Sequence, residues 1–405
     1  MAKGPLSRFA IRVFWLATTF FVLTAGIALA ASGNGRDGSR HRAKLSEARA
    51  VGALSRCVGA RAKRVNPAGV RRRGCGKPAE ASRSPEPLYW GATIGDHVTG
   101  EQAPWDMSAV STFEAEAGKP ASMVQFFQPF ANCDPDCSFY PFPADPVESI
   151  RAHGAIPVLS WSSQAIPSSL SEPDFQLGDV IEGRYDDFIR EFAEEARDWG
   201  HPFFLRFNWE MNGDWFPWAE GVNGNSSGQY VAAWRHVHEI FTAVGATNAS
   251  WVWCPFVDPA GSLTDLSSLY PGDAYVDWTG LDGYNWGTNP AAPRGWRSFD
   301  QLFANSYEEV TARVAPSKPM MIGEMGSSEQ GGDKAAWIRD ALARVPASYP
   351  QIRALLWFDK FDDGMDWPIE TSPAATSAFS QGIAQSVFAG ADYGQLSGGA
   401  IQPPS

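Results

Sequence analysis

The stretch PFFLRFNWEMNGDW, residues 202–215, carries the most information about the fold of this chain. Within an apolar run, polar side chains recur at every second position, at Arg206, Asn208 and Glu210. A period of two is that of a β-strand, so these side chains share one face and the apolar ones between them share the other. The solvated edge of an open sheet would also explain such a row, but a closed barrel has no edges. The stretch therefore predicts a barrel strand whose polar row points into the barrel mouth.

Outward from this strand, short apolar runs alternate with amphipathic stretches. The strand-like runs are Leu88–Ile94, Ser122–Phe130, Ala155–Trp161, Pro202–Asn208, Ala249–Pro255, Val276–Tyr284, Lys318–Gly323 and Ile352–Phe358. The clearest helical patterns are Tyr185–Trp199, Gln229–Val244, Ser298–Val314 and Asp333–Val345. Eight strands alternating with helices over about 300 residues are typical of a (β/α)8 TIM barrel, an α/β fold. A doubly wound open sheet would normally carry a glycine-rich phosphate loop after its first strand, and residues 91–95 do not form one. We therefore expect a single barrel domain over residues 88–390 and a disordered tail over 391–405.

The charge of the chain is unevenly distributed. Its 405 residues carry a formal net charge of −12, yet residues 1–87 contain 17 Lys and Arg against 4 Asp and Glu. The rest of the chain therefore has 16 basic and 41 acidic residues. Because nucleic-acid phosphates need a positive surface, we expect the acidic barrel domain to bind no nucleic acid.

The first 31 residues have the pattern of an export signal. Lys3, Arg8 and Arg12 precede an uncharged run over residues 13–31 that ends in small residues. This pattern predicts a signal peptide and a secreted protein. The run is also just long enough for a transmembrane anchor, which would keep an exported domain at the membrane. Residues 32–87 are rich in Arg, Ala, Gly, Ser and Pro without a lasting apolar period, and predict a disordered basic tether.

The five cysteines fall into three groups. Cys133 and Cys137 bracket Asp-Pro-Asp, and in an exported protein this spacing favours a local disulfide bond. Cys57 and Cys75 lie in the expected tether and could pair there. Cys254 lies in an apolar run and is more typical of a buried thiol than of a nucleophile.

A second carboxylate follows a strand-like run far along the chain. Glu324 lies between Gly323 and Gly326 at the end of the run Met-Met-Ile-Gly-Glu-Met-Gly, where the glycines let other groups approach closely. The alternative is a glutamate that caps the next helix. Because the carboxyl ends of barrel strands meet at one face, we expect Glu210 and Glu324 to lie together there.

Two carboxylates at that face are typical of glycoside hydrolysis with retention of configuration. We expect Glu210 to be the acid/base, because neighbouring Trp side chains would raise the pKa of its carboxyl. Glu324 would be the ionised nucleophile, oriented by the hydroxyl of Tyr284. The two carboxyl groups are predicted to face each other with oxygens about 5–6 Å apart.

Four short motifs resemble those of one known family. They are Glu210-Met-Asn-Gly-Asp-Trp-Phe-Pro-Trp218, the run 322–326 around Glu324, Asp282-Gly-Tyr284, and Leu356-Trp-Phe358. With them the chain resembles glycoside hydrolase family 26 over residues 89–388. The resemblance implies a (β/α)8 barrel with catalytic glutamates on its fourth and seventh strands. It assigns the acid/base to Glu210, the nucleophile to Glu324, a hydrogen bond to that nucleophile to Tyr284, and a sugar platform to Trp357.

Two positions depart from the mannanases of that family. Those enzymes usually have a histidine before the acid/base glutamate and often one after the tryptophan of the third strand, where this chain has Trp209 and Ser162. Because such histidines contact sugar hydroxyls near the scissile bond, their absence bears on the substrate and leaves the reaction type unchanged. The resemblance implies a retaining endo-β-glycanase for β-1,4-mannan, with a mixed-linkage β-1,3-1,4-glucanase or a β-1,3-xylanase as alternatives. A barrel that binds carbohydrate without cutting it is the non-enzymatic alternative, and it would need one of the two glutamates replaced.

Side chains near the strand ends are expected to bind the polysaccharide, since flat Trp rings suit stacking on sugar faces. The predicted set is Trp161, Arg206, Trp209, Asn212, Trp215, Asp282, Tyr284, Trp286 and Trp357. Its members Trp161, Trp215, Trp286 and Trp357 are expected to line one continuous groove.

No cofactor and no metal ion are expected, because the six histidines show no ligand spacing. A calcium site in the acidic segment after the last strand is the alternative, with candidate ligands Asp359, Asp362, Asp363 and Asp366. The chain is expected to act as a monomer.

Overall fold

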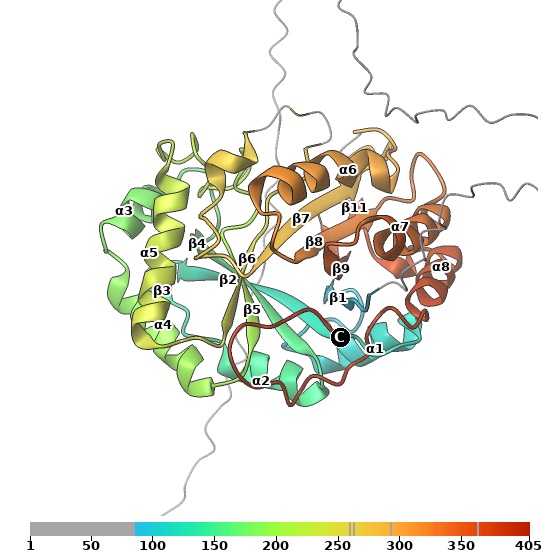
Figure 1. The fold of residues 1–405 in the computed structure, drawn as a ribbon, viewed down its shortest axis with the longest axis horizontal. Helices are drawn as coiled ribbons and strands as arrows, with labels where there is room; N and C mark the ends of the chain where they lie inside the picture. The colour runs from blue at the N-terminus through green and yellow to red at the C-terminus, as the bar shows by residue number, and fades with distance from the viewer. Residues whose placement is uncertain (1–85, 259–260, 262–263, 292–293, 363) are drawn as a thin grey trace, which may run out of the picture. The chain divides into compact units, whose positions relative to one another are not determined.

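The computed structural model describes residues 86–405, apart from 259–260, 262–263, 292–293 and 363. In this part, eight parallel strands close into a barrel (Figure 1). They are β1 (Tyr89–Ile94), β2 (Met123–Cys133), β4 (Ile156–Ile166), β5 (Phe203–Phe207), β6 (Ala249–Trp253), β7 (Trp278–Asn285), β8 (Met320–Ser327) and β9 (Ile352–Asp359). Their order is β1-β9-β8-β7-β6-β5-β4-β2, and β2 pairs with β1 to close the ring. Each predicted strand is present, so the predicted (β/α)8 barrel is confirmed.

Helices surround this barrel. They are α1 (Met107–Ala117), α2 (Ala144–His153), α3 (Leu177–Ile181), α4 (Asp186–Trp199), α5 (Gln229–Val244), α6 (Phe299–Glu309), α7 (Lys334–Ser348) and α8 (Pro373–Ile383). Short 3-10 turns lie at Pro173–Phe175, Leu266–Leu269 and Ile369–Thr371 (η4), and a π-helical turn at Val310–Val314. The ends follow capping chemistry: Ser298 and Gln301 form a capping box at the start of α6, and Gly245 ends α5 in the left-handed region with φ of 80°.

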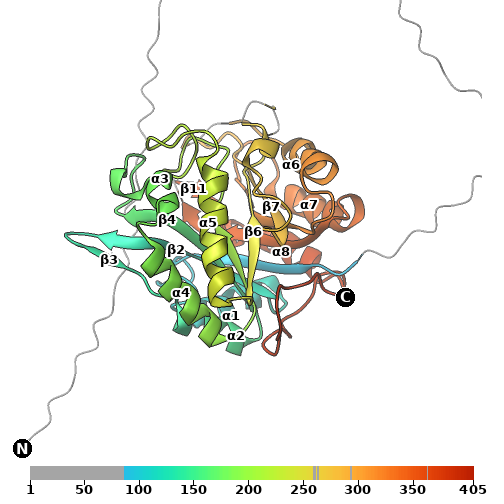
Figure 2. The same cartoon turned by 60° about the vertical axis from the view of Figure 1, so that its left-hand side comes forward.

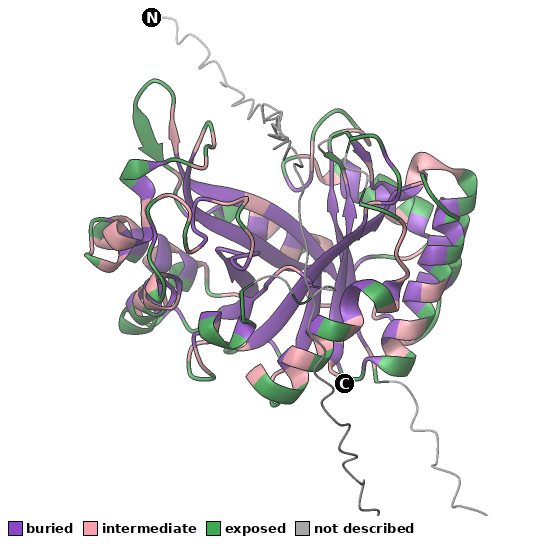
Figure 3. Ribbon diagram, turned by 90° about the horizontal axis from the view of Figure 1, so that it is seen from above, coloured by how far each residue is buried: buried purple, intermediate pink, exposed green. Residues whose placement is uncertain are grey.

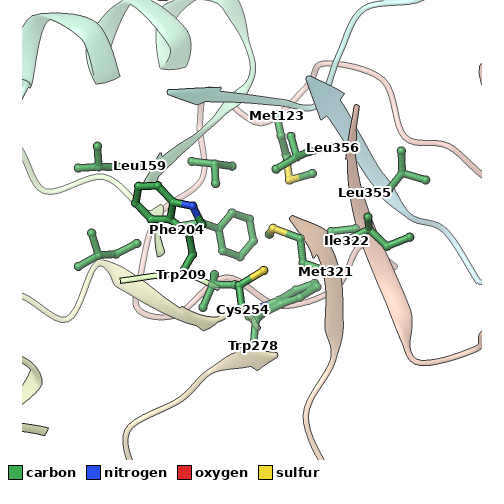
Figure 4. Close-up of a cluster of buried hydrophobic side chains, with 14 of the residues drawn as sticks. Met123, Leu159, Phe204, Trp209, Cys254, Trp278, Met321, Ile322, Leu355 and Leu356 are labelled. Atoms are coloured by element: carbon green, nitrogen blue, oxygen red, sulfur yellow. The ribbon is translucent and has the colours of Figure 1, made fainter. Parts of the chain in front are cut away.

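The strands are buried on both faces, which is why they read as apolar runs. All five residues of β5 and all eight of β8 are buried. The helices turn their buried residues toward the strands and their exposed residues outward (Figure 3). Apolar side chains that include Met123, Leu159, Phe204, Met321 and Leu356 form the buried cluster of Figure 4. This apolar cluster is part of the hydrophobic core of the barrel domain.

A hairpin and a disulfide bond extend β2. Strand β3 (Cys137–Phe139) pairs antiparallel with the end of β2 and projects beyond the barrel (Figure 2). Cys133 and Cys137 lie opposite each other in this register and are joined by the predicted disulfide bond, with Cα atoms 3.8 Å apart. That separation is below the expected range of about 4.4–6.8 Å. Cys254 is a buried free thiol, as predicted.

The C-terminal segment contradicts the expectation of a disordered tail over residues 391–405. Its backbone carbonyls accept hydrogen bonds from Trp278 Nε1 and Tyr89 Oη, and Ile401 N donates to Ser250 Oγ at 2.7 Å. Ile401 itself is 5% exposed. The segment thus packs across the strand beginnings, at the face opposite the mouth. Its sequence has no apolar period, so pattern alone did not predict this packing.

The predicted signal or anchor at residues 1–31 and the tether from residue 32 to 85 lie outside the described residues. Within the part of the chain that the structure describes, no helix has both the length and the apolarity needed to cross a bilayer.

Candidate active site

Glu210 lies just beyond the carboxyl end of β5, in the barrel mouth. After Phe207 the chain turns through positive φ angles at Asn208 (42°) and Glu210 (53°). Residues other than glycine adopt this region rarely, and usually where surrounding contacts hold them. Here Glu210 N donates to Cys254 O at 2.8 Å, and Asn208 Oδ1 accepts from Ser163 N at 2.9 Å. The turn is thus held from both neighbouring strands, β4 and β6.

Glu324 lies within β8 and is no helix cap. Its Oε1 accepts a hydrogen bond from Arg206 Nη1 at 2.6 Å, and its Oε2 accepts one from the hydroxyl of Tyr284. The side chain is 5% exposed. Two donors from two other strands, β5 and β7, therefore fix the direction of this carboxylate.

The two glutamates face each other. One carboxyl oxygen from each of Glu210, Asp282 and Glu324 lies within 4.8 Å of the other two. The Glu210 and Glu324 oxygens are thus at least as close as predicted, and far closer than the roughly 9 Å that leaves room for water between carboxylates in inverting enzymes. The geometry is therefore that of direct attack by one carboxylate on a sugar held between the two.

Arg206 is the cation among these three carboxylates. Its guanidinium is fully buried, pairs with Asp282 and Glu324, and lies over the ring of Trp209 at 5.0 Å. Asp282 is fully buried as well and also accepts from Cys254 Sγ at 3.1 Å. Buried this deeply, Arg206 and Asp282 cannot contact a sugar, which corrects their prediction as substrate-binding residues. They act as positioning residues for Glu324.

Asn212 is also a positioning residue. It is 3% exposed, and its side-chain amide exchanges two hydrogen bonds with the backbone of Phe256, at 2.8 and 2.9 Å. Oδ1 and one N–H of the amide are thus engaged with the backbone, and the binding of substrate by Asn212 stays a prediction. The bonds join the loop after β5 to the loop after β6.

The surroundings of Glu210 favour its protonated form. Burial raises the pKa of Glu210 well above its usual value, and the charges of Asp282 and Glu324 raise it further. Burial and the charge of Glu324 also raise the pKa of Tyr284, so its hydroxyl keeps the proton that it donates. A strongly raised carboxyl pKa in a cleft is typical of acid/base sites.

Trp215 is part of the surroundings of Glu210. Its Nε1 donates to Glu210 Oε2 at 2.6 Å, and its ring contacts Phe256 edge-on with centroids 5.1 Å apart. The indole folds over Gly213, where a Cβ atom would lie 2.3 Å from the ring. Gly213 is therefore needed for this hydrogen bond.

Aromatic side chains from β7 and from the segment after β9 form one wall of the mouth. Tyr284 and Trp286 pack against Trp367, with ring centroids 4.8 and 5.1 Å apart, and Trp286 is partly exposed. Trp209, 6% exposed, packs on Phe127 instead. Trp367 was not predicted because it follows the short strand β11 (Met365–Asp366), which is not one of the eight barrel strands. Its only signal was a Trp-Pro pair in an acidic segment.

Trp161 and Trp357 are not in the mouth, so the prediction of a groove shared with Trp215 and Trp286 is wrong for them. Both are fully buried. Trp161 stacks on Phe192 of α4 at 4.2 Å, and Trp357 packs against Trp337 of α7. Strand alternation turns these rings toward the helices.

Gly323 offers a test of the positioning residues. A Cβ atom there would lie 2.6 Å from Asp282 Oδ1 and 2.7 Å from Cys254 Sγ. Gly323→Ala should displace the Arg206–Asp282 pair and lower kcat on polysaccharide about 100-fold, since small misplacements of a catalytic group have effects of that size. Gly390→Ala is the matched control, because no atom lies within 4 Å of its added methyl group, and it should keep wild-type kcat. Wild-type kcat in Gly323→Ala would show that the pair does not position Glu324.

Comparison with known proteins identifies a family that the chain matches. The sequence profile of glycosyl hydrolase family 26 matches residues 153–339, a range that includes Glu210 and Glu324. The chain is 36% identical over 279 residues to endoglucanase H of Acetivibrio thermocellus, which covers 68% of this chain and 29% of that protein. It is 29% identical over 187 residues to mannan endo-1,4-beta-mannosidase A and B of Caldalkalibacillus mannanilyticus, covering 44% of this chain and 33% of that protein. The chain thus spans about a third of the length of these curated relatives.

A solved structure supports the fold. Mannanase BCman of Bacillus subtilis superposes with a TM-score of 0.54 at 19% identity, covering 79% of this chain and 93% of that chain. At this identity the likeness bears on the barrel architecture alone.

Proposed function

Because this chain belongs to glycosyl hydrolase family 26, we propose that it is a retaining endo-β-glycanase with Glu210 as acid/base and Glu324 as nucleophile. The observation that carries the proposal is the approach of Glu210 and Glu324 carboxyl oxygens to within 4.8 Å. A retaining mechanism needs carboxyl groups about 5 Å apart, and an inverting one needs more than about 6.5 Å. The non-enzymatic alternative, a barrel that only binds carbohydrate, gives no reason for this pairing.

In the first step Glu324 attacks the anomeric carbon while Glu210 protonates the leaving oxygen. The bond from the anomeric carbon to Glu324 forms as the glycosidic bond breaks. The raised pKa of Glu210 keeps its proton available for the leaving group. The hydrogen bonds from Arg206 and Tyr284 stabilise Glu324 as a carboxylate before the attack.

In the second step a water molecule releases the sugar from Glu324. Glu210, now ionised, accepts a proton from this water, which attacks the anomeric carbon from the side that the leaving group vacated. The bond to Glu324 breaks and its carboxylate returns to Arg206 and Tyr284. Two inversions at the same carbon give net retention.

The raised pKa of Glu210 predicts an alkaline limb in the pH profile. As pH rises through this pKa the acid is lost, so kcat/KM on polysaccharide should fall about tenfold per pH unit above it. An aryl glycoside with an activated leaving group needs no proton in the first step, and its kcat/KM should lack this limb. Profiles of kcat/KM on both substrates test the assignment, and the same alkaline limb on both would contradict it.

For the substrate, β-1,4-mannan is the candidate that the sequence resemblance implies. One observation favours β-glucan as the second candidate: identity to endoglucanase H is 36% over 279 residues, against 29% over 187 for the mannosidase. Trp209 occupies the position of the mannanase histidine and packs under Arg206. The chain therefore lacks the histidine contact of the mannanases, which fits this second candidate.

A reducing-sugar assay on mannan, barley β-glucan, β-1,3-xylan and xyloglucan tests the proposed function. We expect release of oligosaccharides from mannan or β-glucan, at a rate at least about 100-fold above that on the other polymers. Early products of mixed length would support endo action. No hydrolysis of any polymer by folded protein would leave the binding-only barrel as the function.

We further propose that the chain is exported and acts as a monomer on polysaccharide, without binding nucleic acid. The positive flank, uncharged run and small residues of positions 1–31 support export, either by cleavage or by anchoring through residues 13–31. N-terminal sequencing of protein from the culture medium distinguishes the two routes, because a cleaved chain would begin near residue 32.

A further inference from the structure

Three side chains that the proposed mechanism does not use converge beside the mouth. His97 follows β1, Asp359 ends β9, and Glu370 lies in η4. His97 Nε2 lies 3.6 Å from Asp359 Oδ2 and 3.6 Å from Glu370 Oε2. One ligand atom from each residue lies within 4.8 Å of the other two. We call these three residues the His97 cluster.

Five polar atoms of the His97 cluster are buried and lack hydrogen-bond partners. Both ring nitrogens of His97, both carboxyl oxygens of Glu370 and Oδ2 of Asp359 have none. Asp359 is fully buried, and its Oδ1 accepts from Ile369 N at 2.8 Å, which directs Oδ2 at His97. A buried carboxylate oxygen without a partner is costly, so native proteins rarely leave one.

An ion pair between protonated His97 and the carboxylates would account for the arrangement less well. Hydrogen bonds from an imidazolium to a carboxylate are about 2.7–2.9 Å long, and neither 3.6 Å contact is near that length. Two ligand atoms bound to one tetrahedral ion at about 2.1 Å each are separated by about 3.4 Å. Both separations from His97 Nε2 are close to that spacing.

We propose that the His97 cluster binds a divalent transition-metal ion of the Zn²⁺ type. An imidazole nitrogen and two carboxylates are ligands that Zn²⁺ accepts, whereas Ca²⁺ takes oxygen ligands. The calcium alternative drawn from the acidic segment does not fit the structure: Asp362 is exposed, and Asp366 accepts hydrogen bonds from Glu329 N and Asn289. Of the described residues in that alternative, Asp359 is the one that lies in the cluster.

A metal ion here would join the loop after β1 to the segment that carries Trp367. That segment is already held on its other side by the buried Lys334, whose Nζ donates to the carbonyls of Asp366, Trp367 and Pro368. Ile94 and Asp359 are register partners in β1 and β9, so the ion would lie at the end of this strand pair. Its expected effect is to stabilise the aromatic wall of the mouth.

Metal content of the full-length protein tests the proposal. The protein is stripped with a chelator, dialysed against Zn²⁺ at the lowest free concentration that saturates the wild type, and assayed for bound zinc. Glu370→Gln and His97→Gln should each contain one zinc per chain fewer than wild type. Substitution of Glu370 should perturb folding less, because its side chain is 28% exposed. Glu370→Gln should therefore fold even where His97→Gln does not. The measured quantity is the difference in zinc content between wild type and variant. Zinc ions bound by His41, Cys57 or Cys75 contribute equally to both and do not affect it.

His153→Gln is the matched control. His153 Nε2 lies 2.9 Å from Glu114 Oε2, an ordinary histidine–carboxylate contact, and the variant should bind as much zinc as wild type. Zn²⁺ should raise the Tm of wild type and His153→Gln by about 5 °C, and that of Glu370→Gln by less than about 1 °C. Equal zinc in wild type and Glu370→Gln would overturn the proposal, as would binding of Ca²⁺ without Zn²⁺. None of these readouts involves turnover, so the glycanase proposal stands or fails separately.

Discussion

Glu324→Ala is expected to reduce hydrolysis by about 10⁴-fold or more on every substrate, including aryl glycosides with activated leaving groups. Without this carboxylate no glycosyl-enzyme forms, and the leaving group has no bearing on that loss. Steady-state rates on polysaccharide and on the aryl glycoside measure the effect. Glu324→Gln keeps the shape of the side chain and should lose activity to a similar extent, which separates lost chemistry from lost packing.

Azide distinguishes a missing nucleophile from a general loss of the site. In Glu324→Ala azide can enter from the face that Glu324 occupied and displace an activated leaving group directly. The product should be the inverted α-glycosyl azide. A β-glycosyl azide from this variant would mean that Glu324 is not the nucleophile.

Glu210→Ala is expected to lose hydrolysis of polysaccharide by about 10²–10⁴-fold while keeping the first step on activated aryl glycosides. Glu324 remains in place and still attacks, since its hydrogen bonds come from Arg206 and Tyr284 and not from Glu210. Stopped-flow measurement should show a burst of phenol followed by slow turnover. The slow phase reflects the missing base for the attacking water.

Added azide should restore turnover of Glu210→Ala, because azide needs no base to attack the glycosyl-enzyme. The expected product is the β-glycosyl azide, with retained configuration. If the burst were absent and azide gave the α-glycosyl azide here instead, the roles of Glu210 and Glu324 would be reversed. Wild-type rates in both variants would remove both residues from the mechanism.

Most of the barrel was predictable because its physics is local. Each strand is buried on both faces, so it appears as an apolar run, and each helix has a polar outer face that gives it a helical period. The same logic brought Glu210 and Glu324 to one face, because a carboxylate that closes an apolar run lies near the carboxyl end of a strand, just beyond β5 for Glu210 and within the last half of β8 for Glu324. Neither inference depended on which strands are neighbours.

Which face a side chain takes was harder to predict. Trp161 and Trp357 lie on barrel strands as expected, but both faces of a barrel strand are buried and apolar. Pattern alone therefore could not tell that their rings pack on Phe192 and Trp337, under the helices. Arg206 and Asp282 were placed at the mouth correctly, and their burial followed only from the ion pairs that they form with each other and with Glu324.

The sequence by itself determined the barrel, the Cys133–Cys137 bond and the two facing glutamates, because each depends on residue spacing within one segment or on the symmetry of a parallel barrel. The tertiary structure alone decided the contacts between loops: Trp367 against Trp286, the C-terminal segment against Trp278, and the meeting of His97 with Asp359 and Glu370. Such contacts join residues far apart in the chain through irregular segments. Irregular segments have no period, so their side chains are positioned only when the closed barrel brings the ends of its strands together.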